Sequence, residues 1–217
     1  MGNLLHIISS PRGADSESNR LAEAFLADYL PAAAGSVVVD TLDLWSGALP
    51  VYGGRGVAAK MSVFAGREPE GEAGAAWDDV KAVAARFAAA DEYLITVPMW
   101  NHGVPWVLKH LIDTITQPGL LFGFDPEAGY TGLLEHKRAV VVYTGAVYFE
   151  GAPPAFGADF HRSYFNDWLR FVGIDDVSEI RFQPNLVVAD AESGRRDALR
   201  QARAIAAEWS ARRALAA

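Results

Sequence analysis

A short segment near the N-terminus gathers the residue types that bind phosphate. Ser9–Asn19 holds four serines, an arginine and a glycine, directly after an apolar run and directly before a helical pattern. Hydroxyls and unpaired N–H groups at a helix N-terminus can hold a phosphate without a lysine. Helix capping is the alternative, but a cap needs only one such residue. We therefore expect a phosphate-binding loop here. Its expected donors are Ser10, Ser16, Ser18 and Asn19.

A second segment, Pro98–Trp106, combines flat apolar side chains with hydrogen-bonding groups. Its distinctive residues are Met99, Trp100, Asn101, His102 and Trp106. A flavin ring needs this mixture, because its faces are apolar while its pyrimidine edge forms hydrogen bonds. Core packing is the alternative for each tryptophan taken alone. Together, after a strand, these residues favour a ligand site.

A third segment, Tyr143–Tyr148, follows another apolar run. Small residues at Thr144, Gly145 and Ala146 would let backbone N–H groups approach a planar ligand closely. Taken alone, this third segment is a weak signal.

Other chemistries lack the residues that they require. The chain has no cysteine, no GxSxG elbow, and no HExxH or comparable ligand spacing among its five histidines. Thiolate chemistry, serine hydrolysis and a metal site therefore have no sequence support. The Walker and GxGxxG phosphate motifs are also absent. We expect no metal, and no side chain that serves as an essential acid or base; His6 lies in a strand and is expected to be a core residue.

Charge and hydropathy limit the partners and the compartment. The net charge of −8 argues against nucleic acid, since phosphate backbones bind to basic surfaces. No stretch approaches the roughly 20 apolar residues that span a bilayer, so we expect no membrane association. The N-terminus lacks the pattern of a signal peptide, and we expect a cytoplasmic protein.

The elements that must position these segments alternate along the chain. Apolar runs predict buried parallel strands at Leu4–Ile8, Val37–Val39, Tyr93–Val97, Ala139–Tyr143 and Val177–Phe182. Helical spacing of apolar residues separates them, and an Ala/Arg-rich helix is expected over Ala191–Ala216. This alternation predicts an α/β fold with helices on both faces of a parallel sheet.

Five strands favour the flavodoxin-like, doubly wound order 2-1-3-4-5 in a single domain over residues 1–217. The stretch 53–74 interrupts the pattern with glycines, charges and Pro69. We interpret it as an insertion that covers a site or a partner, with a disordered loop as the alternative. Ligands of such sheets bind beyond the carboxyl ends of the strands, where the strand order reverses. That rule places the first two segments in one site.

Three stretches of the chain resemble one family. Ser9–Asn19, then Pro98-Met99-Trp100-Asn101, then Gly119–Phe124 resemble the FMN-dependent NADH-azoreductases and their quinone-reductase relatives, over nearly the whole chain. The resemblance implies a homodimer with one FMN near each subunit boundary. It also implies electron transfer from NADH or NADPH to quinones or azo compounds by a ping-pong hydride mechanism, with the chemistry carried by FMN.

The resemblance also implies roles for individual residues. The FMN phosphate would meet Ser10, Ser16, Ser18 and the backbone of Glu17, and the isoalloxazine would meet Met99, Trp100, Asn101 and His102. The third segment, which commonly reads Ser-Arg-Gly-Gly in the family, would bind the cofactor through Tyr143, Thr144, Gly145 and Ala146. This departure keeps one glycine and loses the arginine.

Two further interpretations compete with the enzyme. A flavodoxin-type electron carrier would hold FMN without a small-molecule substrate of its own, and a serine-dependent hydrolase has no visible nucleophile–base pair. The aromatic-rich stretch from Trp100 to Phe124 favours an enclosed pocket for a small aromatic or quinonoid substrate. That stretch and Phe149–Phe165 carry too many apolar residues to face water entirely, which agrees with the implied homodimer.

Overall fold

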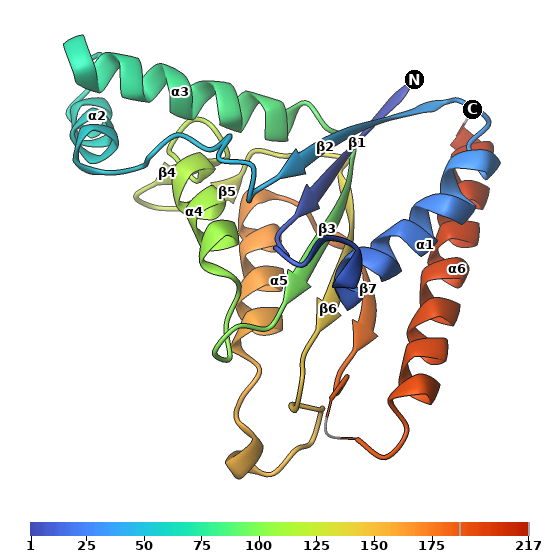
Figure 1. Cartoon of the computed structure of the whole chain (residues 1–217). Helices are drawn as coiled ribbons and strands as arrows, with labels where there is room; N and C mark the ends of the chain where they lie inside the picture. The colour runs from blue at the N-terminus through green and yellow to red at the C-terminus, as the bar shows by residue number, and fades with distance from the viewer. Residues whose placement is uncertain (187, 217) are drawn as a thin grey trace.

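A five-stranded parallel sheet forms the centre of the molecule (Figure 1). The computed structural model describes residues 1–186 and 188–216. In sheet order, the strands are β2 (Val37–Asp43), β1 (Gly2–Ile8), β3 (Glu92–Pro98), β6 (Arg138–Thr144) and β7 (Asp176–Phe182). Every neighbouring pair is parallel. Counted within this sheet alone, the order is the predicted 2-1-3-4-5.

Helices cover both faces of the sheet, because the central strands are apolar on both sides. Alternate residues of β3 enter different cores: Tyr93 and Ile95 join one cluster, and Leu94 joins the other. Helices α1 (Glu17–Ala32) and α6 (Ala191–Ala216) pack on the Leu94 side. On the opposite face lie α3 (Gly71–Ala88), α4 (Trp106–Ile115) and α5 (Phe160–Val172).

Two elements differ from the sequence-based prediction. Part of the stretch 53–74 folds into helix α2 (Gly54–Phe64), which packs on α3 through Ala59, Trp77 and Val80. The antiparallel hairpin of β4 (Phe122–Asp125) and β5 (Gly129–Gly132) was not predicted. Its strands are only four residues long and contain glycine, so they carry almost no strand signal.

Strand β2 is longer than its apolar core suggests. The prediction covered Val37–Val39, whereas the strand continues to Asp43. Its second half carries Asp40, Thr41 and Asp43 on an edge strand that is paired only with β1, and edge strands tolerate polar, exposed residues. Short one-turn helices also form at Gly13–Asp15 and Pro154–Phe156. In the described part of the chain, no helix is both long and apolar enough to cross a membrane.

The amino end of β3 carries a buried ionic cluster. Glu92 is 3% exposed and accepts hydrogen bonds from Tyr29 Oη (2.7 and 2.9 Å), Arg138 Nη2 (2.6 Å) and Arg213 Nη2 (2.5 Å). The Arg138 guanidinium also lies 4.0 Å from the ring centre of Trp209, in cation–π contact. This cluster, which we call the Glu92 cluster, joins α1, α6, β3 and β6 at one edge of the sheet.

Candidate functional site

A pocket of about 170 Å³ opens at the carboxyl edge of the sheet. The three segments singled out in the sequence meet there, together with the loop after β7. The lining residues are Ser10, Pro11, Arg12, Ser16, Glu17, Pro98, Met99, Trp100, Thr144, Gly145, Ala146, Asn185 and Leu186. We call this the sheet-edge pocket. It lies where the strand order reverses, as the topology rule requires.

The serine loop is held in shape by its own hydrogen bonds. Ser16 caps α1, since its Oγ accepts from the Asn19 N–H (3.3 Å) and lies 3.0 Å from Ser18 Oγ. The Asn19 amide donates to the Gly13 carbonyl (3.0 Å), and the Ser9 N–H donates to Thr96 Oγ1 on β3 (3.0 Å). The loop is therefore ordered against the sheet without a ligand.

This loop offers unpaired donors beside the pocket. The first-turn N–H groups of a helix have no intrahelical partner, and those of Glu17 and Ser18 have none elsewhere in the described residues. The Ser18 and Asn19 side chains are buried behind the lining. Serine hydroxyls, helix N–H groups and the Arg12 guanidinium together suit a phosphate group.

One acidic side chain lines the same pocket. Glu17 accepts two hydrogen bonds from Arg195 of α6, from Nη2 to Oε1 (2.7 Å) and from Nε to Oε2 (3.1 Å). The hydrogen bond from Arg195 holds the pKa of Glu17 below its ordinary value, so the carboxyl stays ionised. Beside the pocket, Glu17 thus carries a negative charge that is paired mainly by a distant helix, while Arg20 of α1 lies 3.9 Å away as a weaker second partner.

The second segment turns tightly after β3. Trp100 and Gly103 exchange two backbone hydrogen bonds of 2.9 Å, and the central residues Asn101 and His102 have φ of 49° and 68°. Two positive φ values are the geometry of a type I′ turn, which is strained for residues other than glycine. The turn presents Trp100 to the pocket, and the Met99 N–H donates to the Thr144 carbonyl (2.7 Å).

His102 contacts a different part of the chain. The Ala158 N–H donates to His102 Nδ1 (3.1 Å), and the Phe160 N–H donates to the His102 carbonyl (3.0 Å). Its ring occupies the place where a Cβ on Gly157 would stand. His102 therefore connects the second segment to the start of α5, and it is not among the residues that line the sheet-edge pocket.

The third segment is joined to the loop after β7. Gly145 donates to the Phe182 carbonyl (3.3 Å), and the Asn185 N–H donates to the Gly145 carbonyl (2.9 Å). A Cβ on Gly145 would stand 2.9 Å from Nε2 at the end of the Gln183 side chain, so a larger residue here would displace that amide. The Ala146 N–H has no partner within the described residues and borders the pocket.

Tyr143 faces the core. Its side chain is fully buried, it donates to Asn166 Oδ1 (2.7 Å), and burial raises the pKa of its phenol well above the ordinary value. Tyr143 has the same strand parity as Ala139 and Val141, which enter the same core cluster. The predicted residue Tyr143 thus supports the third segment from beneath.

A second, larger hollow adjoins the first. It measures about 500 Å³ and shares Trp100 with the sheet-edge pocket. The other lining residues are Tyr52, Asn101, Val104, Trp106, Lys109, His110 and Asp113. Trp45 packs between Trp100 and Trp106, with ring centres 5.6 Å from each. We call this the indole pocket.

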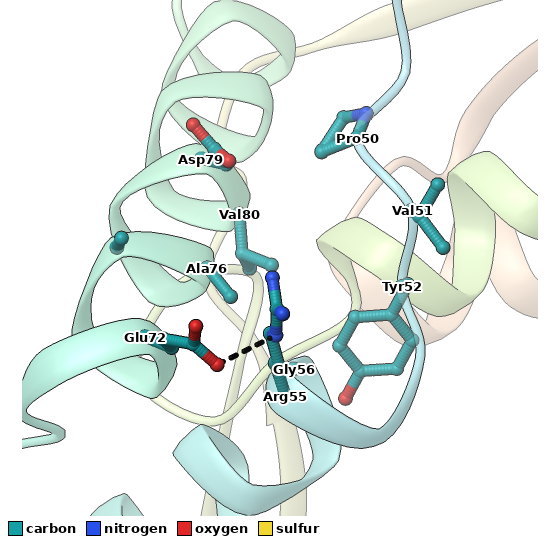
Figure 2. Close-up of a pocket in the computed structure, with 10 residues that line it drawn as sticks. Pro50, Val51, Tyr52, Arg55, Gly56, Glu72, Ala76, Asp79 and Val80 are labelled. Carbon is teal, nitrogen blue, oxygen red and sulfur yellow. Dashed lines mark ion pairs between the residues drawn. The ribbon is translucent and has the colours of Figure 1, made fainter.

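A third hollow lies farther from these loops, between α2 and α3. Figure 2 shows Arg55 and Glu72 pointing toward one another in this pocket, joined by an ion pair of 3.1 Å. Its volume is about 320 Å³, and the segment Pro50–Tyr52 closes one side. None of the predicted site residues lines it.

The structure thus brings together most of the predicted site and separates a few members from it. Eight predicted residues line the sheet-edge pocket: Ser10, Ser16, Glu17, Met99, Trp100, Thr144, Gly145 and Ala146. Asn101 lines only the indole pocket, while Ser18, Asn19, His102 and Tyr143 line neither pocket. Sequence reasoning left out Arg12, which stands inside the serine loop, and also Asn185 and Leu186. The last two follow the fifth strand, so the same sheet-edge rule could have found them.

The pocket residues fit the phosphate and ring of FMN. The serine loop supplies hydrogen-bond donors to the lining, Met99 and Trp100 supply apolar surface, and the third segment adds the small residues Gly145 and Ala146. Among the described residues, no group of three His, Cys, Asp or Glu side chains gathers as a metal site.

Comparisons with known proteins agree with this geometry. A model of the flavodoxin-like fold family matches residues 2–206. An FMN-dependent NADH:quinone oxidoreductase of Ruegeria pomeroyi is 48% identical over 89% of this chain and 95% of its own length. A protein with the same description from Desulfotalea psychrophila is 38% identical over 86% of this chain and 87% of its own length.

Solved structures show the same similarity. An azoreductase from Bacillus anthracis strain Sterne superposes with a TM-score of 0.86 at 25% identity, covering 95% of this chain and 99% of that one. An FMN-dependent NADH-azoreductase from Bacillus anthracis strain Ames Ancestor, solved in complex with FMN, also gives 0.86, at 21% identity; it covers 97% of this chain and 100% of that one. The second similarity concerns the fold alone.

Proposed function

This chain belongs to the flavodoxin-like fold family and to that of the FMN-dependent NADH:quinone oxidoreductases, and from that premise we propose that it reduces quinones or azo compounds with NADH or NADPH through bound FMN. The observation that carries the proposal is the sheet-edge pocket, where three separately predicted segments meet. FMN, when bound, supplies the two-electron chemistry.

At the phosphate end, the chain supplies neutral donors and one cation. We assign the phosphate to the Ser10 and Ser16 hydroxyls, to the first-turn N–H groups of α1 and to Arg12. The helix N-terminus adds a favourable partial positive charge. Because internal hydrogen bonds already order the loop, little conformational entropy is lost when the phosphate binds.

At the ring end, we assign the flat contacts to Met99 and Trp100. The Ala146 N–H is the donor that we assign to the polar edge of the ring, since the Gly145 N–H is engaged with Phe182. The titratable side chains that line the pocket are Arg12 and Glu17, and the Glu17 carboxyl is held ionised by Arg195. Neither suits proton transfer near neutral pH, and we assign no catalytic acid or base.

We propose that the indole pocket receives the acceptor. It adjoins the sheet-edge pocket through Trp100, and its indole walls match a small aromatic or quinonoid molecule. Tyr52 ties the start of the stretch 53–74 to this pocket, since its N–H donates to His110 Nε2 (3.4 Å). Gly56 of the stretch lies against the Tyr52 ring, and we propose that the stretch supports Tyr52 as one wall of the pocket.

We also propose that the chain forms a homodimer and acts in the cytoplasm. Aromatic side chains in and near the stretches Trp100–Phe124 and Phe149–Phe165 remain exposed. Among them are Trp106 (61%), Phe160 (63%), Phe124 (61%) and Tyr130 (64%). Large apolar patches on a protein surface favour burial against a partner. Sedimentation at micromolar concentration should give twice the chain mass; a fully active monomer contradicts this assembly.

The experiment that tests the function begins with the absorbance spectrum of the purified protein. We expect bound flavin that chromatography identifies as FMN, in a ratio of one per chain, and steady-state oxidation of NADH when a quinone is added. FAD, or no flavin after reconstitution, overturns the proposal. FMN binding without quinone-dependent NADH oxidation would instead identify an electron carrier.

A further inference from the structure

Glu17 stands where a negative charge opposes the proposed ligand. It is the first residue of α1 and lines the pocket beside Ser10, Ser16 and Arg12. A carboxylate at a helix N-terminus competes with a phosphate for the same N–H groups and repels its charge. Its pKa is lowered, so protonation does not remove that charge near neutral pH.

Arg195 holds both oxygens of this carboxylate. The two hydrogen bonds, 2.7 and 3.1 Å long, form a bidentate pair between residues that are 178 positions apart. The Glu17 side chain is 17% exposed and that of Arg195 33%, so water screens the pair only in part. Arg195 is fixed in turn by an ion pair with Glu192 and by the Phe182 ring, whose centre lies 5.6 Å from the guanidinium.

We propose that Arg195 is a positioning residue for FMN: it neutralises Glu17 and holds its carboxylate away from the first-turn N–H groups of α1, leaving them to the phosphate. This inference rests on the proposed function. Arg195 is not among the lining residues, so it acts through Glu17 and not on the ligand. Its contribution therefore requires a charge on Glu17 and a phosphate on the flavin.

Another ion pair on the same helix provides a matched control. Arg200 pairs with Asp197 on the surface of α6, within one helical turn. A pair of this kind contributes little to stability and has no connection with the pocket. If Arg195 served only to attach α6 to α1, its loss would weaken the binding of FMN and riboflavin alike.

The test is a double-mutant cycle on the flavin-depleted full-length chain. FMN and riboflavin, which lacks the phosphate, are titrated by flavin fluorescence against wild type, Arg195→Gln, Glu17→Gln, the double variant and Arg200→Gln. We expect Arg195→Gln to weaken the binding of FMN about tenfold or more at low salt. A loss of this size matches the repulsion of one like-charge contact near a protein surface. Riboflavin should change less than about twofold, and the effect should shrink as salt screens the charge.

The double variant gives the decisive result. Once Glu17→Gln has removed the charge, loss of Arg195 should no longer weaken the binding of FMN. The double variant should therefore bind FMN with the same affinity as Glu17→Gln. Equal losses for FMN and riboflavin, an unchanged FMN affinity in Arg195→Gln, or additive effects in the double variant each overturn the inference while leaving the proposed function intact. Failure of the wild type to bind either flavin overturns both.

Discussion

The two ends of strand β3 carry polar residues that are arranged in opposite ways. At its amino end, Glu92 is buried and accepts hydrogen bonds from Tyr29, Arg138 and Arg213. At its carboxyl end, serine hydroxyls and backbone N–H groups border an open pocket, and the adjacent turn is strained at Asn101 and His102. Both ends draw side chains from elements far apart in the sequence.

The difference separates stability from binding. Buried polar groups that are fully paired within the protein hold its elements together. Groups left without internal partners cost stability unless a ligand pairs with them, which is why strain and unpaired donors gather at sites. We therefore expect substitutions at the amino end to alter folding alone, and those at the carboxyl end to alter flavin binding alone.

The largest effect is expected at the Glu92 cluster. Glu92→Ala leaves two half-buried guanidinium groups without their buried carboxylate. Breaking a buried ion pair in this way typically costs about 3–5 kcal/mol in the free energy of unfolding. Urea denaturation measures this loss, while the FMN content of the folded fraction should stay at one per chain. Asp40→Ala, which breaks the exposed pair with Arg86, is the control and should cost less than about 1 kcal/mol. A large loss of FMN affinity in Glu92→Ala would contradict the expectation that the amino end of β3 affects folding and not flavin binding.

The next effect concerns a buried group that lies between the two ends. His6 is in the middle of β1, its Nε2 has no partner among the described residues, and burial lowers its pKa from 6.5 to about 4. As the pH falls, His6 of the unfolded chain therefore takes up a proton at a higher pH than His6 of the folded chain. Stability should decrease by about 1.4 kcal/mol for each pH unit between 6.5 and 4, roughly 3 kcal/mol in all.

Urea denaturation at several pH values checks the His6 prediction. His6→Leu removes this titration and should reduce the pH dependence over that range; the remainder comes from paired carboxylates such as Glu17, whose pKa is also lowered. His136→Asn, at an exposed histidine, is the matched control variant. An equal slope in wild type and His6→Leu would contradict the assignment.

A smaller effect is expected at the wall of the site. Trp100 lines both pockets and is 37% exposed, so Trp100→Ala should weaken FMN by about 1–3 kcal/mol through lost flat contact area. Excess FMN should restore much of the rate, and kcat/KM for quinones should fall more than the NADH half-reaction does. Unchanged flavin affinity and acceptor kinetics, together with a drop of several kcal/mol in stability, would show that Trp100 is a core residue.

The smallest effect isolates binding from folding. Aspartate caps helices as well as serine does, so Ser16→Asp should change stability by less than about 0.5 kcal/mol. Its carboxylate would face the phosphate and should weaken FMN about tenfold, with little change for riboflavin. Parallel titrations of the two flavins and urea denaturation measure the contrast. An unchanged FMN affinity would place the phosphate elsewhere.

Structural features that depend on residues close together in the sequence could be predicted. The continuous apolar runs of β1, β3 and β6 and the polar loops after them placed the sheet-edge pocket correctly, because burial on both faces leaves a plain signal. Strand parity could also have excluded Tyr143 from the pocket, since it alternates with residues of the other core.

Contacts between distant residues could not be predicted in this way. Three features depend on how the elements pack: the contact of His102 with Ala158, the pairing of Glu17 with Arg195, and the joining of two helices and two strands at Glu92. Helix α2 was missed because glycines and charges in 53–74 conceal a helix that is stabilised by packing on α3.

Helix α6 also bears on how the molecule is completed during synthesis. It follows every other described element, yet it supplies Arg213 and Trp209 to one edge of the sheet and Arg195 to the other. A nascent chain that already contains all five strands still lacks these three side chains. The ionic cluster at Glu92 and the pairing of Glu17 with Arg195 can therefore form only after α6 has been synthesised.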